Sequence, residues 1–198
     1  MSDAILNDVE LLEFWEAQVS PHITALINSS CRFPELQAHF NQNNELITAR
    51  YNTSLRVFVR PPLSKDHSDG FPMGCRLEDG KPTIAIFPHA LLSGLRKLIA
   101  RKPTTAQKIF ESEIHIGFLH ETDHLALGLV GADDRYPRIK QEQLAWAETC
   151  EQTIRPLLVT HRREVSESTL IFYKAWIACG RKPKSNQWRD FISSKYGW

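Results

Sequence analysis

The chain has 198 residues, of which 42% are hydrophobic and 24% charged, and its formal net charge is +1. This composition is typical of a soluble globular protein, so we expect one domain over residues 1–198 that buries a hydrophobic core. A near-neutral chain without a long basic run gives no electrostatic reason to expect a nucleic-acid partner. The four cysteines lack CxxC spacing and the density of a disulfide scaffold, so we expect reduced, mostly buried thiols.

The first residues also bear on location. Acidic side chains stand where a secretory signal would be basic, and no apolar run approaches the roughly 20 residues needed to cross a bilayer. We therefore expect a cytoplasmic protein without a membrane partner. Delivery by a bacterial secretion machine that leaves no N-terminal mark is the alternative.

The first forty residues predict a layer of helices. Apolar residues at helical spacing favour helices over residues 9–18, 21–30 and 34–40. The polar run from Asn41 to Asn44 then indicates a break in the chain.

A hairpin and a loop are predicted next. Residues 46–51 and 55–60 alternate between apolar and polar side chains, as paired strands do, and Pro61 and Pro62 end the second strand. The turn-forming segment 63–72 predicts an exposed loop, and the alternative is that it borders a cleft.

The following hairpin has stronger turn chemistry. MGCRLE and PTIAIF flank Asp79 and Gly80, a dipeptide typical of a tight turn. The second strand, Thr83 to Phe87, is followed by a helix predicted over about residues 90–100.

One pattern carries a chemical mechanism, and it is HExxH at His120, Glu121 and His124. On an α-helix, residues four apart lie on one face, so both imidazoles can face one metal ion. Glu121 projects about 100° further round the helix, where its carboxylate can take a proton from a metal-bound water. Zinc held by two imidazoles and a third protein ligand lowers the pKa of that water to about 7. The alternative is a structural helix with two hydrogen-bonded histidines.

These three residues make the chain resemble the zincin metallopeptidases. The metzincin continuation HExxHxxGxxH is absent, because no third histidine follows in LALGLVGADDR. The resemblance is therefore to the gluzincin branch, whose third ligand is a glutamate on the next helix. It implies a single zincin-like metallopeptidase domain with one Zn²⁺ per chain and a peptide or protein substrate.

Glu142 is the candidate for the third ligand. In the helix predicted over RIKQEQLAWAETCEQTI, it lies on the flank of the apolar side, one turn before Trp146. It also opens Glu-Gln-Leu-Ala, which is similar to the ExxA pattern around the gluzincin ligand. Glu148 and Glu151 are alternatives, as is a solvated role for all three. Pro156 is predicted to end or kink this helix.

Further expectations concern catalysis. Asp123 is charged where active zincins usually carry a small or uncharged residue. It pairs with an arginine, orients an imidazole, or marks a site that binds metal without turning over peptide. Zincins often stabilise the oxyanion with a downstream His or Tyr, for which His161 and Tyr173 are the candidates. By the same resemblance, residues 83–87 are the candidate edge strand for substrate, with an interior strand as the alternative.

The remaining chain predicts two helices that pack in the core. SESTLIFYKAWIACG begins with a capping serine and ends at Gly180. A last helix over about residues 186–195 carries the apolar side chains Trp188, Phe191 and Ile192.

The predicted fold is α+β and zincin-like in its order, with N-terminal helices, a small mostly antiparallel sheet and a helical half that carries the HExxH helix. The predicted function is zinc-dependent peptide hydrolysis, with His120, His124 and Glu142 as metal ligands and Glu121 as the base. One alternative is a catalytically silent metal-binding or regulatory module. Another is a di-iron site built on Glu121 and His124, but it needs a second ExxH that the chain lacks.

Overall fold

The structure is a computed structural model that describes residues 20–59, 73–87, 106–130 and 137–197, besides a few isolated positions. The helices expected over 9–18 and 90–100 and the loop expected over 63–72 lie almost wholly outside the described residues. The fold within the described part is α+β. Its elements in chain order are α2 (Ser20–Ile27), α3 (Pro34–Tyr51), β1 (Arg56–Val59), β2 (Met73–Glu78), β3 (Lys81–Ile86), α5 (Ala106–Ala126), α6 (Arg138–Thr149), the π-helical turn η2 (Cys150–Ile154), α7 (Arg155–Thr160), the 3₁₀ turn η3 (Arg162–Glu164), α8 (Glu167–Ala178) and α9 (Asn186–Tyr196).

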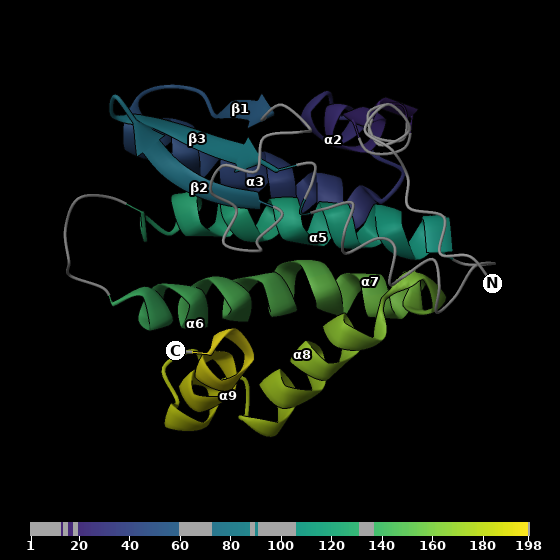
Figure 1. Cartoon of the computed structure of the whole chain (residues 1–198), viewed down its shortest axis with the longest axis vertical. Helices are drawn as coiled ribbons and strands as arrows, with labels where there is room; N and C mark the ends of the chain where they lie inside the picture. Colours follow the sequence, from purple (N-terminus) through teal and green to yellow (C-terminus); the bar gives the residue numbers. More distant parts are fainter. Residues whose placement is uncertain are drawn as a thin grey trace.

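Helix α5, which carries HExxH, is the central element. Figure 1 shows the sheet and α3 on one side of α5, the continuous α6 to α7 rod on the other, and α8 and α9 beyond that rod. Helix α5 contacts α3, β2 and α6 directly. Its apolar residues are buried around much of its circumference, as expected for a helix enclosed by neighbours.

The sheet has the strand order β1-β3-β2. The second predicted hairpin is confirmed, because β2 and β3 pair antiparallel and both turn residues have positive φ, 52° at Asp79 and 74° at Gly80. Strand β1 pairs parallel with β3, so the sheet is mixed rather than mostly antiparallel. Most of the segment 83–87, the candidate edge strand, belongs to β3. Strand β3 lies between β1 and β2, so the expectation of an edge strand is wrong and the alternative, an interior strand, is confirmed.

The strand predicted over residues 55–60 is confirmed as β1, but its expected hairpin partner over residues 46–51 and the break before that segment are wrong. A single helix, α3, runs from Pro34 to Tyr51 through the polar segment. Asn43 is buried there because its amide donates to the hydroxyl of Thr122 and the carboxylate of Asp123, both at 2.8 Å. Ile47 is buried one turn later. These tertiary contacts override the weak local helix preference.

The end of α5 is set by Gly128, as its sequence position indicates. Gly128 has φ +66°, and its backbone N–H donates to the carbonyl of Leu125 at 3.0 Å. The next N–H, of Leu129, donates to the carbonyl of His124 at 2.9 Å. This is the left-handed termination that favours glycine, and the side chain of Arg50 packs over it.

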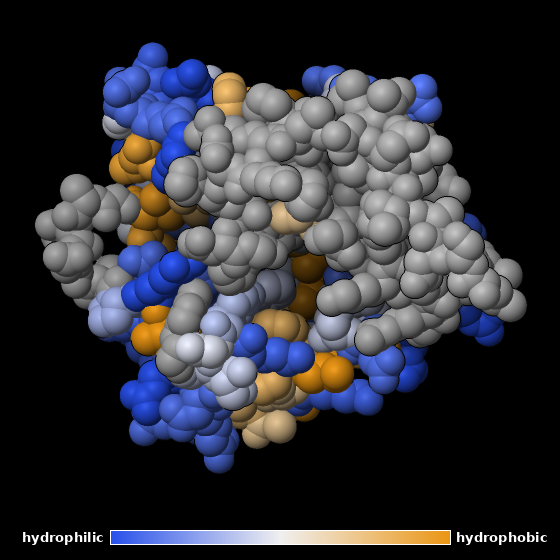
Figure 2. Space-filling view, viewed as in Figure 1, coloured by the Kyte–Doolittle hydropathy of each residue, from blue (hydrophilic) through white to orange (hydrophobic). Residues whose placement is uncertain are grey.

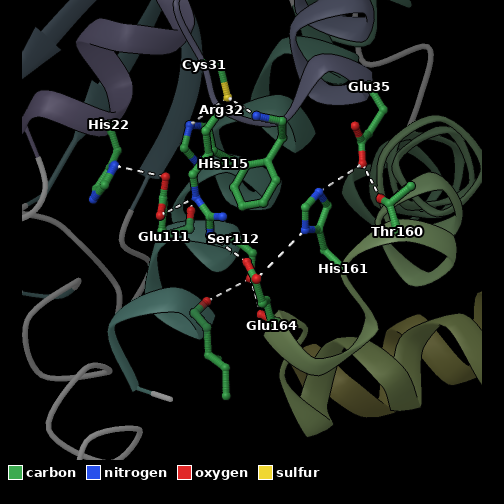
Figure 3. A network of polar contacts seen from close by, with 12 residues as sticks. His22, Cys31, Arg32, Glu35, Glu111, Ser112, His115, Thr160, His161 and Glu164 are labelled. Carbon is green, nitrogen blue, oxygen red and sulfur yellow. Dashed lines mark hydrogen bonds and ion pairs between the residues drawn. The ribbon is translucent and has the colours of Figure 1, made fainter. Parts of the chain in front are cut away.

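The start of α5 is fixed by a polar network that Figure 3 shows. Arg32, in the link between α2 and α3, donates to Glu111 at 2.7 Å and to Glu164 of η3 at 2.5 Å. The hydroxyl of Ser112 donates to the carbonyl of Glu164 at 2.5 Å. The N-terminal half of α5 is thereby joined to two segments distant in sequence.

The rod after α5 contains a local irregularity before Pro156. The N–H of Arg155 donates to the carbonyl of Cys150, which is the wider hydrogen-bond spacing of a π turn. The helix then continues through Pro156, which lacks a backbone N–H, to Thr160. Pro156 therefore accompanies a change of helix type and does not end the helix.

Both C-terminal helices are confirmed, and so is the serine cap predicted for the first of them. The hydroxyl of Ser166 accepts from the N–H of Thr169 at 3.1 Å, and Ser185 caps α9 in the same way. Trp188 and Ile192 are fully buried. The described surface at this end of the molecule is largely hydrophilic, with hydrophobic residues between (Figure 2). None of the described helices is both long and apolar enough to cross a membrane.

Candidate metal centre

Three side chains predicted as ligands converge where α5 and α6 lie side by side. The Nε2 atoms of His120 and His124 are 3.2 Å apart. One carboxylate oxygen of Glu142 lies 3.2 Å from His120 Nε2, and the other lies 3.4 Å from His124 Nε2. Both histidines are buried, and Glu142 is partly buried. The ligand atoms thus face a common point between the two helices.

These separations fit a metal ion. Ligand bonds of about 2.0–2.1 Å at a tetrahedral angle place neighbouring ligand atoms about 3.3 Å apart. The distance of 3.2 Å between the two Nε2 atoms is close to that value, and the Glu142 carboxylate approaches the two histidines at 3.2 and 3.4 Å through different oxygens. Two imidazole nitrogens and a carboxylate form a group that can hold a divalent cation.

The charges at this point reinforce one another. Burial raises the pKa of Glu142, but the neighbouring imidazoles of His120 and His124 outweigh it and hold that pKa well below its usual range. Burial lowers the pKa of His124, yet the Glu142 carboxylate raises it more, so the pKa of His124 is above its ordinary value. An ionised carboxylate therefore lies beside the two imidazoles and supplies a negative charge where the three side chains converge.

Glu121 lies on the flank of α5 that faces β2. A Cβ atom at Gly117, one turn earlier, would lie 3.8 Å from the Sδ of Met73 in β2. Two residues further along β2, burial raises the pKa of the Cys75 thiol, and the neighbouring Glu121 carboxylate raises it further. Glu121, the predicted base, therefore lies beside Cys75 of β2.

The alternative third ligands are placed elsewhere. Glu151 accepts a hydrogen bond from the indole N–H of Trp176 at 2.6 Å and pairs with Arg155 at 3.1 Å. Glu148 is half-buried, and burial raises its pKa. It lines a cavity of about 610 Å³ with Leu127, Trp176 and others, and none of the three converging ligands lines that cavity.

The aromatic contacts of the site come from α6 and α9. The indole of Trp146 stacks on the imidazole of His120 at 4.0 Å with an interplanar angle of 24°. The indole N–H of Trp146 donates to the hydroxyl of Tyr196 at 2.6 Å. Burial raises the pKa of Tyr196, and the charges of Glu142 and Glu121 raise it further. Tyr196 therefore lies beside the site, although no motif in the sequence indicated it.

The two residues considered for the oxyanion have other neighbours. The ring of His161 lies 4.9 Å from the ring of Phe33, and its nitrogens lie 3.8 Å from Glu35 and from Glu164. Figure 3 shows it within the network at the start of α5. Tyr173 packs against the hydrophobic core.

Asp123 is completely buried. Its carboxylate accepts hydrogen bonds from His39 at 2.7 Å, Asn43 at 2.8 Å and Thr149 at 2.6 Å. Sequence reasoning missed all three partners. Two signals were present: Thr149 follows Glu142 by two helical turns, and His39 and Asn43 have i, i+4 spacing.

Comparison with known proteins gives no relative. No family model, curated protein or solved structure matches this chain.

Proposed function

We propose that the protein is a zinc-dependent metallopeptidase of zincin type with a gluzincin ligand arrangement. The observation that supports this most strongly is the convergence of His120, His124 and Glu142 in a group that can hold a metal ion, with Glu121 on its flank. A zinc ion bound there supplies a Lewis acid that polarises a carbonyl group and activates water.

The protein's own groups take the remaining roles. Glu121 accepts a proton from the attacking water and returns a proton to the leaving amine. We assign the hydroxyl of Tyr196 to the developing oxyanion, because it is hydrogen-bonded to Trp146, whose indole stacks on the candidate ligand His120. Trp146 contacts both groups: its indole N–H donates to this hydroxyl, and its ring stacks on the imidazole of His120.

Strand β2 is the proposed support for an extended peptide. Within the described residues it pairs with β3 alone, and it lies along the flank of α5 that carries Glu121. Backbone groups of an edge strand hold a peptide through main-chain hydrogen bonds without fixing its side chains. A polypeptide substrate is therefore expected, bound along β2 and not along β3.

The test of this function is hydrolysis of a peptide library by the zinc-loaded protein. Glu121→Gln should lower the rate by about 10²- to 10⁴-fold, because it removes the base and leaves the ligands in place. The variant should keep its zinc. Glu148→Gln, which makes the same chemical change on α6 away from the ligands, should retain activity.

The same assay separates the proposal from a silent metal-binding module. The silent module would be favoured if the wild type takes up zinc but cleaves no peptide. In that case the Glu121→Gln variant would not differ from the wild type in the assay. A di-iron protein would hold two irons, whereas the described residues contain one group of possible ligands.

A further inference from the structure

We propose that Asp123 is a positioning residue of the metal centre, which acts through the Thr149 hydroxyl to fix the tautomer of His120. The inference rests on the proposed metal centre and adds to it a relay of three side chains. The relay runs from Asp123 through Thr149 to His120, on the side of α5 opposite Glu121.

Helix geometry separates the two acidic residues of the motif. Relative to His120, Glu121 projects about 100° in one direction, whereas Asp123, three residues on, projects about 60° in the other. Glu121 therefore faces β2, and Asp123 faces α3 and the end of α6. One helical turn thus supplies a proton acceptor on one side of the ligands and a buried carboxylate on the other.

The Thr149 hydroxyl has a single proton to donate. Its oxygen lies 2.6 Å from Asp123 Oδ2 and 2.9 Å from the carbonyl of Ala145. The shorter contact, to a carboxylate, is the stronger hydrogen bond. Whichever acceptor takes that proton, the oxygen can only accept from the Nδ1 atom of His120, which lies 3.2 Å away.

The consequence for His120 is a fixed tautomer. When its Nδ1 atom carries the proton and donates to Thr149, its Nε2 atom presents a lone pair to His124 and Glu142. Metal-bound histidines are commonly oriented in this way by an outer hydrogen bond, which sets the tautomer and ring orientation. The stacking of Trp146 restricts the same ring from its face.

The other oxygen of Asp123 is held by α3. His39 Nε2 lies 2.7 Å and Asn43 Nδ2 lies 2.8 Å from Asp123 Oδ1. The polar segment that interrupts the apolar pattern of α3 therefore has a role, which is to anchor the carboxylate that orients His120. A buried carboxylate with both oxygens hydrogen-bonded has a single well-defined position.

The test replaces Thr149, because removal of Asp123 would also leave buried partners unpaired. Thr149→Val keeps the shape of the side chain and removes the hydroxyl, whereas Thr149→Ser keeps the hydroxyl. Thr153→Val is the matched control, since Thr153 is buried one turn on and its hydroxyl has no hydrogen-bond partner among the described residues. Zinc affinity is measured by competition with a chromophoric chelator, and the visible spectrum of the cobalt(II) form reports ligand geometry.

Thr149→Val should raise the zinc Kd about 10- to 100-fold and alter the cobalt spectrum. Thr149→Ser and Thr153→Val should bind zinc like the wild type. If Thr149→Val does not fold, Thr149→Ala carries the same expectation. A Thr149→Val or Thr149→Ala variant that binds zinc as tightly as the wild type would overturn the relay and leave the metal centre standing. A wild type that takes up no zinc would overturn the centre, and this inference with it.

Discussion

Three acidic residues of α5 have different surroundings. Glu113 accepts from the backbone N–H of Ser166 and the hydroxyl of Thr169 at the start of α8. Glu121 faces β2 beside the ligands, and Asp123 is buried between α3 and the end of α6. Each carboxylate takes its role from the element that packs against it.

Glu113 gives a prediction about pH. Burial raises the pKa of its carboxyl above the ordinary value of 4.5, although hydrogen bonds from Thr169 and Ser166 oppose that shift. The stabilising contribution of a group with a raised folded-state pKa is complete below its unfolded pKa and is lost as the pH rises through the folded value. The stability of the wild type relative to Glu113→Gln should therefore fall between about pH 4 and about pH 7.

Urea unfolding of the metal-free proteins at both pH values measures this difference. Glu45→Gln, at an exposed position of α3, is the control, and its difference from the wild type should stay constant. A difference between wild type and Glu113→Gln that is also independent of pH would contradict a raised pKa.

At the scale of elements, the C-terminal end of α5 gives a prediction about stability. Gly128 closes the helix at φ +66°, where Arg50 packs against it. Gly128→Ala should lower the free energy of unfolding by about 1–2 kcal/mol, because a Cβ atom is strained in the left-handed region. Any contact of that atom with the flexible end of Arg50 adds to this cost.

Gly74→Ala is the control for this change. Gly74 in β2 has no positive φ, and nothing lies within 4 Å of the position of an added Cβ. Its replacement should change stability by less than about 0.5 kcal/mol. If thermal or urea unfolding gives equal values for both variants, the left-handed termination does not limit the stability of α5.

Local signals predicted some elements well and others badly. The HExxH helix, the hairpin at Asp79 and Gly80 and the two C-terminal helices follow from periodicity, caps and turn residues. Helix α3 was divided wrongly because Asn43 has its partners in α5, eighty residues away. The position of β3 in the sheet depends on the parallel pairing of β1, which leaves no local pattern.

The residues of the candidate site also separate into those that local patterns predict and those that depend on contacts between elements. Helix geometry alone predicts that His120 and His124 share one face of α5. Glu142 was the candidate third ligand by the resemblance to gluzincins, and the packing of α6 on α5 brings its carboxylate beside both histidines. Thr149, His39 and Tyr196 were missed because each reaches the site through packing of separate elements. Single-sequence patterns describe one element at a time, and these residues belong to contacts between elements.

At the scale of the whole molecule, the ligands join two layers. The sheet and α3 lie on one side of α5, and the helices from α6 to α9 lie on the other (Figure 1). Two ligands come from α5 and one from α6, so a bound ion would link the layers directly. A ligand that binds only the folded state stabilises it, so zinc should raise the melting temperature.

The most direct measurement is the metal content of untagged protein, purified without chelator and analysed for its elements. The wild type should hold one zinc per chain, and His120→Ala and Glu142→Ala should each lose it. Glu148→Ala, on the same helix as Glu142, should retain it. A wild type that holds no metal and takes up none from micromolar zinc would contradict the metal centre, and the proposed peptidase function with it.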